Sequence, residues 1–119
     1  MAEQLADEYF KKRFEEFVSD KISRADFDIE KFTNRHQHNY KHLAELYKNA
    51  FEKILDNFRN KYNRNIVAAF KKLQDEGYVE IITSAATHGY LPLLSRDSSI
   101  YAQIKIGIDV YEKHFGRKP

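Results

Sequence analysis

The sequence contains few side chains suited to binding or catalysis, and these are histidines, hydroxyls and carboxylates. His88 stands beside Thr87, Gly89 and Tyr90 in a stretch that is typical of a loop. A loop imidazole can contact a ligand, or it can make a local turn contact. Thr87 and Ser84 can add hydroxyl contacts beside it. His88 is therefore the first candidate for a binding residue, and both interpretations of it stay open on this evidence.

Three other histidines have the only metal-like spacing, His36-x-His38-x3-His42. His38 and His42 share a helix face if the helix begins early enough. The sequence contains no cysteine to complete a tetrahedral set, and Glu45 is the one carboxylate within reach of His42. We therefore interpret these histidines as surface residues at a helix start, and we expect no metal and no other cofactor.

The helices predicted for the first half of the chain follow from apolar spacing. Apolar residues recur at steps of three to five from Leu5 to Val18, which predicts a helix over residues 2–19. The pattern weakens over residues 20–37, which we interpret as a loop with a short helical piece. A long helix is then predicted, because one apolar stripe runs from Tyr40 to Tyr62.

The second half contains all the glycines and prolines of the chain, beginning with Gly77. A third helix is predicted from residue 63 or 65 to Gly77, where a left-handed residue is expected. Residues 78–84 are rich in β-branched and aromatic side chains, which predicts a strand. Glu80 lies in the first half of this strand, away from its carboxyl end, and we interpret it as a structural pairing group.

A loop over residues 85–95 follows the predicted strand, because it contains Gly89 and Pro92. Asp97 is then expected to cap a last helix, which runs to His114 and ends at Gly116. His88 thus lies after a strand, at the place where parallel α/β proteins gather ligands.

Length and composition indicate one folded domain. The chain has 119 residues, of which 42% are hydrophobic and 32% charged, and this excludes a disordered chain and a membrane span. The net charge of +2 gives no reason to expect a nucleic acid or a membrane as partner. The start of the chain has no continuous apolar run, so we expect a cytoplasmic protein.

One strand cannot satisfy its own backbone hydrogen bonds. The predicted strand is therefore either an edge on a mainly helical domain or one piece of a larger α/β protein. The residues alone leave both open. The blocks EIITSAATHGYLPLL, AQI and HFGRKP favour the second, because their order and spacing resemble the central catalytic-barrel segment of glycoside hydrolase family 57. Its 1,4-α-glucan branching enzymes are the most similar subgroup. The block LADEYFKKRFEEFV is similar to the helical insertion that precedes this strand in the family.

The resemblance implies an α/β fold, of which this chain is a helix-rich fragment. Residues 1–119 would be part of a catalytic domain with a (β/α)7 barrel. Residues 1–62 would form the helical insertion, and residues 63–119 a helix-strand-loop-helix unit with its strand at about 78–84. The segment 19–42 has no counterpart that we identify.

The resemblance also implies an activity, in which α-1,4 links of an α-glucan are cleaved with retention and the chain is transferred to form α-1,6 branches. The expected nucleophile Glu and acid/base Asp lie outside this sequence, so we expect no catalytic residue in it and no activity of it alone. The matching loop histidine of the family lines the glucan pocket, which favours His88, Tyr90 and Thr87 as substrate-binding residues. Tyr90 packed with neighbouring leucines is an equal alternative. The family uses no catalytic metal.

Two expectations concern partners. The partner implied by the resemblance is an α-glucan such as amylose or a glycogen-like chain, and the isolated chain is expected to self-associate through exposed apolar surface. The alternative to the enzyme is a stand-alone, mainly helical protein-interaction module without catalysis.

Overall fold

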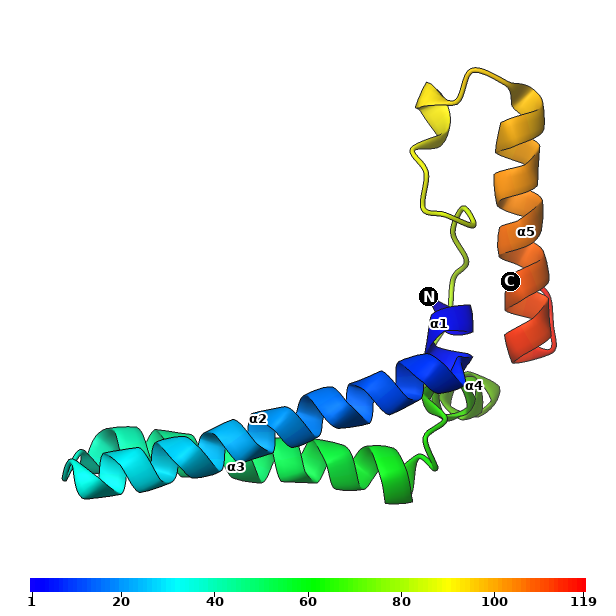
Figure 1. The fold of residues 1–119 in the computed structure, drawn as a ribbon. Coiled ribbons are helices and arrows are strands. Elements are labelled where there is room, and N and C mark those ends of the chain that lie inside the picture. The colour runs from blue at the N-terminus through cyan, green and yellow to red at the C-terminus, as the bar shows by residue number, and fades with distance from the viewer. The chain divides into compact units, whose positions relative to one another are not determined.

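The computed structural model describes residues 1–119, and its elements are helices joined by irregular segments (Figure 1). The chain divides into two compact units. We call Ala6–Asn65 the hairpin unit, and Met1–Leu5 together with Ile66–Pro119 the loop unit. None of the helices has a stretch long and apolar enough to span a membrane.

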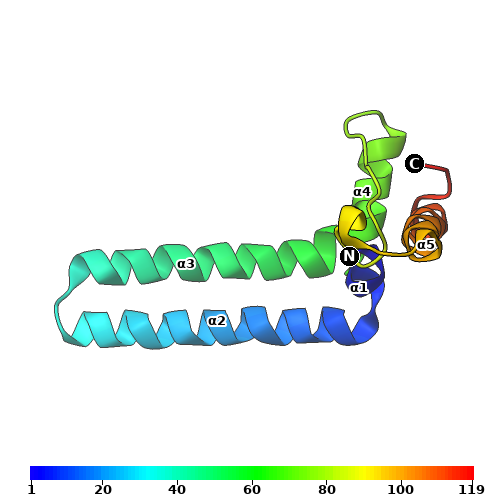
Figure 2. The same cartoon turned by 90° about the horizontal axis from the view of Figure 1, so that it is seen from above.

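The hairpin unit is built from two long helices, α2 (Glu8–Asn34) and α3 (His38–Asp56), which run side by side in opposite directions (Figures 1 and 2). A separate short helix, α1 (Ala2–Ala6), precedes them. Asp7 caps α2, because its Oδ1 accepts a hydrogen bond of 2.9 Å from the backbone N–H of Phe10. The predicted helix over residues 2–19 is therefore interrupted at Asp7.

The predicted loop over residues 20–37 is wrong, since α2 continues to Asn34. Val18 and Ala25 are buried along this helix, and Asp26 pairs with Lys48 of α3 at 2.7 Å. Packing and pairing against α3 thus stabilise a helix whose own apolar pattern is weak. The Asp26 carboxylate, which accepts a hydrogen bond from Lys48, raises the pKa of that ammonium above its ordinary value.

A tight turn joins the two helices of the hairpin unit. His36 has a left-handed backbone with a φ of 54°. The N–H of Gln37 donates to the carbonyl of Phe32 at 2.9 Å, which is the 6→1 bond of a Schellman ending. His36 therefore occupies the position at which most such helix ends carry glycine.

The far end of α3 widens into a π-helix, η1 (Asn57–Lys61), in which the N–H of Tyr62 donates to the carbonyl of Asn57 at 2.9 Å. Phe58 in this turn is 7% exposed, and its ring packs edge-on against Phe14 of α2 with centroids 4.8 Å apart. Sequence periodicity predicted a helix as far as residue 62 and gave no sign of this change of pitch.

The loop unit contains α4 (Ile66–Asp75), the 3-10 helix η2 (Leu91–Leu93) and α5 (Asp97–Phe115). The predicted left-handed glycine after the third helix is confirmed, because Gly77 has a φ of 80°. The predicted end of the last helix is also confirmed, because Gly116 has a φ of 73°. Arg96, not Asp97, occupies the N-cap of α5 and makes no side-chain capping bond.

The predicted strand at residues 78–84 is wrong, because this segment forms no strand ladder. No backbone hydrogen bond joins residues 79–84 to any other part of the chain. Burial nevertheless alternates along it, with Ile81, Thr83 and Ala85 half-buried and the residues between them exposed. The segment therefore has the two-residue period of a strand, but the neighbouring strand that would complete a ladder does not occur in these residues.

The core of the loop unit is small. Val67 of α4 packs with Tyr111 and Phe115 of α5, and Ile81 of the extended segment and Leu5 of α1 cover this cluster. The core therefore joins α1, α4 and α5 to the start of the segment that leads to His88.

Candidate functional site

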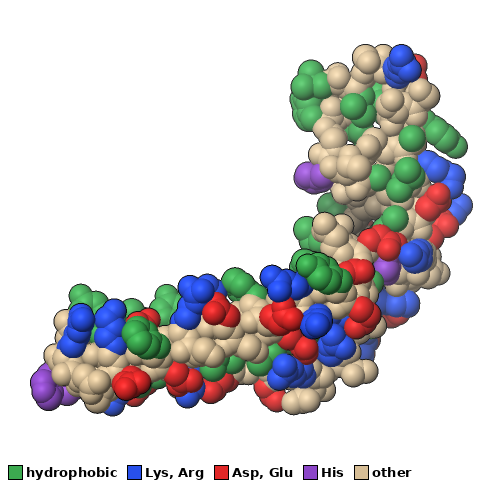
Figure 3. Space-filling model, in the orientation of Figure 1, with side chains coloured by type: hydrophobic (Ala, Val, Ile, Leu, Met, Phe, Trp, Pro, Cys, Tyr) green, Lys and Arg blue, Asp and Glu red, His purple; other side chains and the backbone are tan.

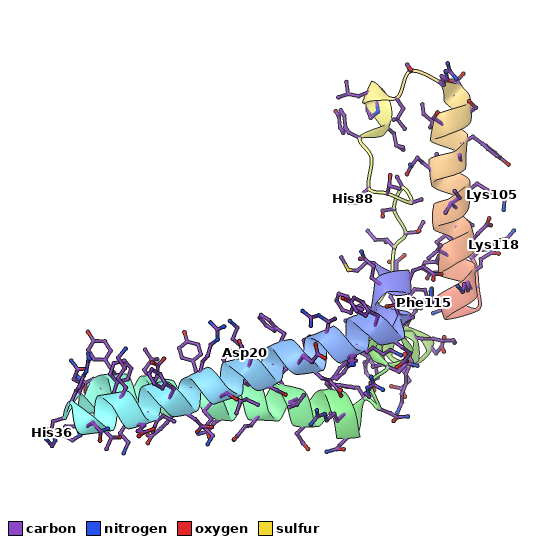
Figure 4. All side chains as sticks on the ribbon, viewed as in Figure 1. Asp20, His36, His88, Lys105, Phe115 and Lys118 are labelled. Atoms are coloured by element: carbon purple, nitrogen blue, oxygen red, sulfur yellow. The ribbon has the colours of Figure 1, made fainter.

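The candidate site is the turn that follows the extended segment and carries His88 (Figure 4). The N–H of His88 donates to the carbonyl of Ala85 at 2.9 Å and closes the turn. The side chain of His88 is exposed and has no hydrogen-bond partner in the chain. It lies on the side of the segment that faces away from α5 (Figure 4). The imidazole is therefore free to contact a ligand.

His88 has a left-handed backbone with a φ of 58°. This conformation costs roughly 1 kcal/mol or more for a residue with a Cβ atom. Such a residue keeps this conformation only where the surrounding hydrogen bonds impose it, and positions of this kind occur often at binding sites. Sequence reasoning selected His88 by its loop position and did not foresee the backbone conformation.

A glutamine of α5 imposes the conformation of the turn. The carbonyl of Gln103 accepts from the N–H of Ala86 at 3.0 Å. Its side-chain Oε1 accepts from the N–H of Thr87 at 2.9 Å, and its Nε2 donates to Thr87 Oγ1 at 2.9 Å. Thr87 Oγ1 also lies 3.2 Å from Gln103 Oε1, to which it can donate. Four hydrogen-bond contacts with one helical residue thus hold the two residues before His88. Sequence reasoning missed Gln103, although it stands in the AQI block.

Tyr90 lies two residues beyond His88 and is 70% exposed. It caps η2, and its carbonyl accepts a bond of 3.0 Å from the N–H of Leu93. Leu93 is itself 80% exposed, so the tyrosine ring is not buried by it. The ring therefore offers an exposed aromatic face two residues from His88.

The extended segment lies against α5 through a close backbone approach. Thr83 Oγ1 donates to the carbonyl of Gly107 at 3.0 Å. A Cβ atom on Gly107 would lie 2.2 Å from the carbonyl oxygen of Ser84. Only glycine therefore allows this contact, which fixes the height of the segment along α5 and hence the start of the turn.

Charged groups gather at the other end of α5, away from the turn. Asp75 at the end of α4 accepts a hydrogen bond from Lys71, which lowers the pKa of Asp75, and Arg117 Nη2 lies 3.7 Å from its Oδ1. With its carbonyl oxygen turned toward Arg117, buried Gln74 accepts from Tyr111 Oη at 2.8 Å and from Arg117 Nε at 2.5 Å. These contacts anchor the HFGRKP block to α4.

Other residues considered from the sequence lie apart from the turn. Glu80 is exposed and forms no ion pair or hydrogen bond, so its interpretation as a structural pairing group is wrong. His36 and His38 belong to the hairpin unit, at its connecting turn and at the first residue of α3. No group of three or more His, Cys, Asp and Glu side chains is arranged to hold a metal ion.

The sequence profile of glycosyl hydrolase family 57 matches residues 2–119. This chain belongs to that family. The family predicted from the sequence blocks is thereby confirmed over nearly the whole chain, including the hairpin unit.

The chain is also similar to individual proteins of known type. The 1,4-alpha-glucan branching enzyme of Thermococcus kodakarensis is 48% identical over the whole chain, which corresponds to 17% of that enzyme. The crystal structure of a family 57 branching enzyme from Pyrococcus horikoshii has a TM-score of 0.90 and 47% identity over 99% of this chain and 22% of that chain.

Two further crystal structures are similar. The alpha-amylase AmyC of Thermotoga maritima has a TM-score of 0.85 and 35% identity, and 99% of this chain covers 23% of it. The branching enzyme of Thermococcus kodakaraensis, solved in complex with glucose and additives, has a TM-score of 0.71 and 45% identity over 99% of this chain and 20% of that chain. The chain therefore spans about a fifth of the length of its relatives, and it is more identical to the two branching enzymes than to the amylase.

Proposed function

We propose that this chain is a segment of an α-glucan branching enzyme, which cleaves α-1,4 links with retention and transfers the released chain to form α-1,6 branches. The observation that carries the proposal is the identity of 48% to a 1,4-alpha-glucan branching enzyme along the entire chain. The identity to the amylase is lower, at 35%, and this favours transfer over hydrolysis. A stand-alone interaction module has no comparable support.

In this proposal, residues 78–84 become one strand of a (β/α)7 barrel when the rest of the protein is present. Two features support this. The segment already has the alternating burial of a strand, with one face packed on α5. The backbone groups of residues 79–84 make no hydrogen bonds to other backbone groups of the chain, so they are free to pair with neighbouring strands.

We assign glucan contact to His88, Tyr90 and Thr87. The imidazole can hydrogen-bond a sugar hydroxyl, and the exposed face of Tyr90 can pack on a sugar ring. The Thr87 hydroxyl accepts from Gln103 Nε2 at 2.9 Å. The same hydroxyl donates to Gln103 Oε1 at 3.2 Å, and a sugar oxygen would replace this acceptor when glucan binds.

Retention requires a nucleophilic carboxylate and an acid about 5 Å apart across the scissile bond. The turn supplies hydroxyl, imidazole and aromatic groups and no carboxylate, because residues 84–90 contain neither Asp nor Glu. We therefore propose that this segment binds glucan and that other parts of the enzyme supply the carboxylates, so that the isolated chain is inactive.

The test uses the complete product of the open reading frame that contains these residues, next to the 119-residue chain, each incubated with amylose. We expect new α-1,6 links only with the complete protein. Proton NMR detects these links, and a debranching enzyme releases the branches as short chains. Reducing ends without branches would show a hydrolase instead. Branching by the isolated chain, or no action of the complete protein on any α-glucan, would overturn the proposal.

A further inference from the structure

The direction of the His88 imidazole depends on the backbone, because its side chain makes no hydrogen bond to the rest of the chain. Its φ of 58° lies in the left-handed region, which is uncommon for residues other than glycine. Something in the structure must therefore hold the turn in this shape before a ligand arrives.

Gln103 is the residue that meets this requirement. It lies on α5, whose position is set by the core of Val67, Tyr111 and Phe115. Its main chain and side chain together accept the N–H groups of Ala86 and Thr87, at 3.0 and 2.9 Å. Its amide nitrogen donates to Thr87 Oγ1 at 2.9 Å. The helix thereby fixes two consecutive peptide groups directly before His88.

We propose that Gln103 is a positioning residue for glucan binding, which acts by holding the 85–88 turn so that the His88 imidazole projects toward the substrate. The inference rests on the proposed function, in which His88 contacts the glucan. Gln103 itself touches the turn and not the sugar. Its substitution should therefore matter only as long as His88 is present.

Two substitutions separate the hydrogen bonds from the size of the side chain. Gln103→Met keeps a long, unbranched side chain but removes all the side-chain hydrogen bonds to Thr87. Gln103→Glu keeps them, because a carboxylate accepts from the Thr87 N–H and from the Thr87 hydroxyl, which then becomes the donor. Gln4→Met is the matched control, since Gln4 is exposed on α1 and its side chain makes no hydrogen bond.

The experiment is a double-mutant cycle in the complete protein, with kcat/KM for amylose as the readout. His88→Ala and Gln103→Met are each expected to lower kcat/KM by about tenfold, the effect of one well-made hydrogen bond. The double variant should lose no more than His88→Ala alone, and Gln103→Glu should keep most of the activity. Gln4→Met should leave it unchanged.

The outcomes distinguish the two proposals. If His88→Ala has no effect, the glucan contact is wrong, and the role of Gln103 falls with it. If His88→Ala lowers kcat/KM but Gln103→Met does not, or if the two losses multiply, the glucan contact stands and the positioning role is wrong. A crystal structure of the Gln103→Met protein is a second measurement, in which His88 should leave the left-handed region; an unchanged turn contradicts the proposal.

Discussion

Four residues other than glycine have left-handed backbone, and they mark the sharp turns of this chain: His36, Asn63, Arg64 and His88. His36 ends a helix and Asn63 and Arg64 follow the π-helix, so their conformations serve the fold. His88 differs, because it lies in an exposed turn that a distant glutamine holds. The same left-handed conformation thus reverses the chain in the hairpin unit, and in the loop unit it sets the direction of an exposed imidazole.

Substitution of His36 tests the structural role. His36→Gly should stabilise the hairpin unit by about 0.5 to 1 kcal/mol, because glycine adopts the left-handed conformation without a Cβ penalty. The matched substitution His42→Gly, within α3, should destabilise it by roughly 0.5 to 1 kcal/mol. Urea unfolding followed by circular dichroism measures both. Two changes of the same sign would show that the helix ending is not what holds His36.

Gly107 is the second position at which the presence or absence of a Cβ atom affects stability. Gly107→Ala should destabilise the loop unit by about 1 to 3 kcal/mol, because the new Cβ meets a backbone oxygen that cannot easily move. Gly89→Ala is the matched control, since the nearest atom to its Cβ lies 3.8 Å away. Thermal unfolding is the measurement. A stabilised Gly107→Ala chain, the usual effect of this change in a helix, would contradict the close approach.

At the scale of the element, the sequence predicted those helix ends that glycine determines. Gly77 and Gly116 end α4 and α5 as expected, since their left-handed φ is a local property. The middle of α2 was missed, because it is held by the burial of Ala25 and by the ion pair with Lys48, both of which depend on α3. Long-range contacts of this kind have little effect on the local spacing of apolar residues, so this spacing does not predict them.

The predicted strand failed for a related reason. Residue types between 78 and 84 indicate an extended backbone, and the alternating burial agrees with that. A strand also requires a hydrogen-bonded neighbour, which residue types within the segment do not specify. The candidate site could be predicted only in part for the same reason. The loop position of His88 follows from neighbouring residues, whereas the hydrogen bond between Thr87 and Gln103 joins residues 16 apart in sequence.

A buried polar contact joins α4 to α5 beside their apolar core. Tyr111 is 5% exposed, and its hydroxyl bonds the buried amide of Gln74. Tyr111→Phe should destabilise the loop unit by about 1 to 2 kcal/mol, because the Gln74 amide loses a buried partner. Tyr101→Phe, at a position 68% exposed on the same helix, should have no measurable effect. Equal unfolding free energies for both variants would show that the contact is not needed.

The attachment of α1 to α5 should depend on pH. Lys113 Nζ donates to Glu3 Oε1 at 2.8 Å and lowers the pKa of Glu3 below its ordinary value of 4.5, with a smaller effect of His114. Because the folded pKa is the lower one, the ion pair stabilises the docked helix above the unfolded value, and this stabilisation is lost as pH falls through the lowered pKa.

Amide hydrogen exchange of Leu5, whose N–H donates to the carbonyl of Met1, reports this docking. Protection of Leu5 should fall in acid below pH 4.5, the ordinary pKa of Glu3. In a Glu3→Gln chain, protection should already be reduced near neutral pH and should change less with acid. Equal pH dependence in both chains would contradict a role for the Glu3 carboxylate.

At the scale of the whole molecule, many large hydrophobic side chains are exposed. Its buried hydrophobic core contains no large side chain that is less than 2% exposed. Hydrophobic side chains stand on the surface of both units (Figure 3). In the loop unit, Tyr78, Ile82 and Leu93 are exposed by 75%, 83% and 80%. Surface of this kind is normally covered by further protein, as the match to a fifth of a larger enzyme implies.

This exposure predicts that the isolated chain self-associates. Burial of apolar area contributes about 25 cal/mol per Å², and the effect weakens on cooling, so association should be stronger at room temperature than in the cold. Sedimentation velocity should show a concentration-dependent rise in mass that the double substitution Ile82→Lys and Leu93→Lys reduces. The double substitution Ser95→Lys and Ser98→Lys, at two exposed polar positions, adds the same two charges and is the control. A chain that stays monomeric throughout, or a control that dissociates it equally, would show that these apolar side chains do not drive association.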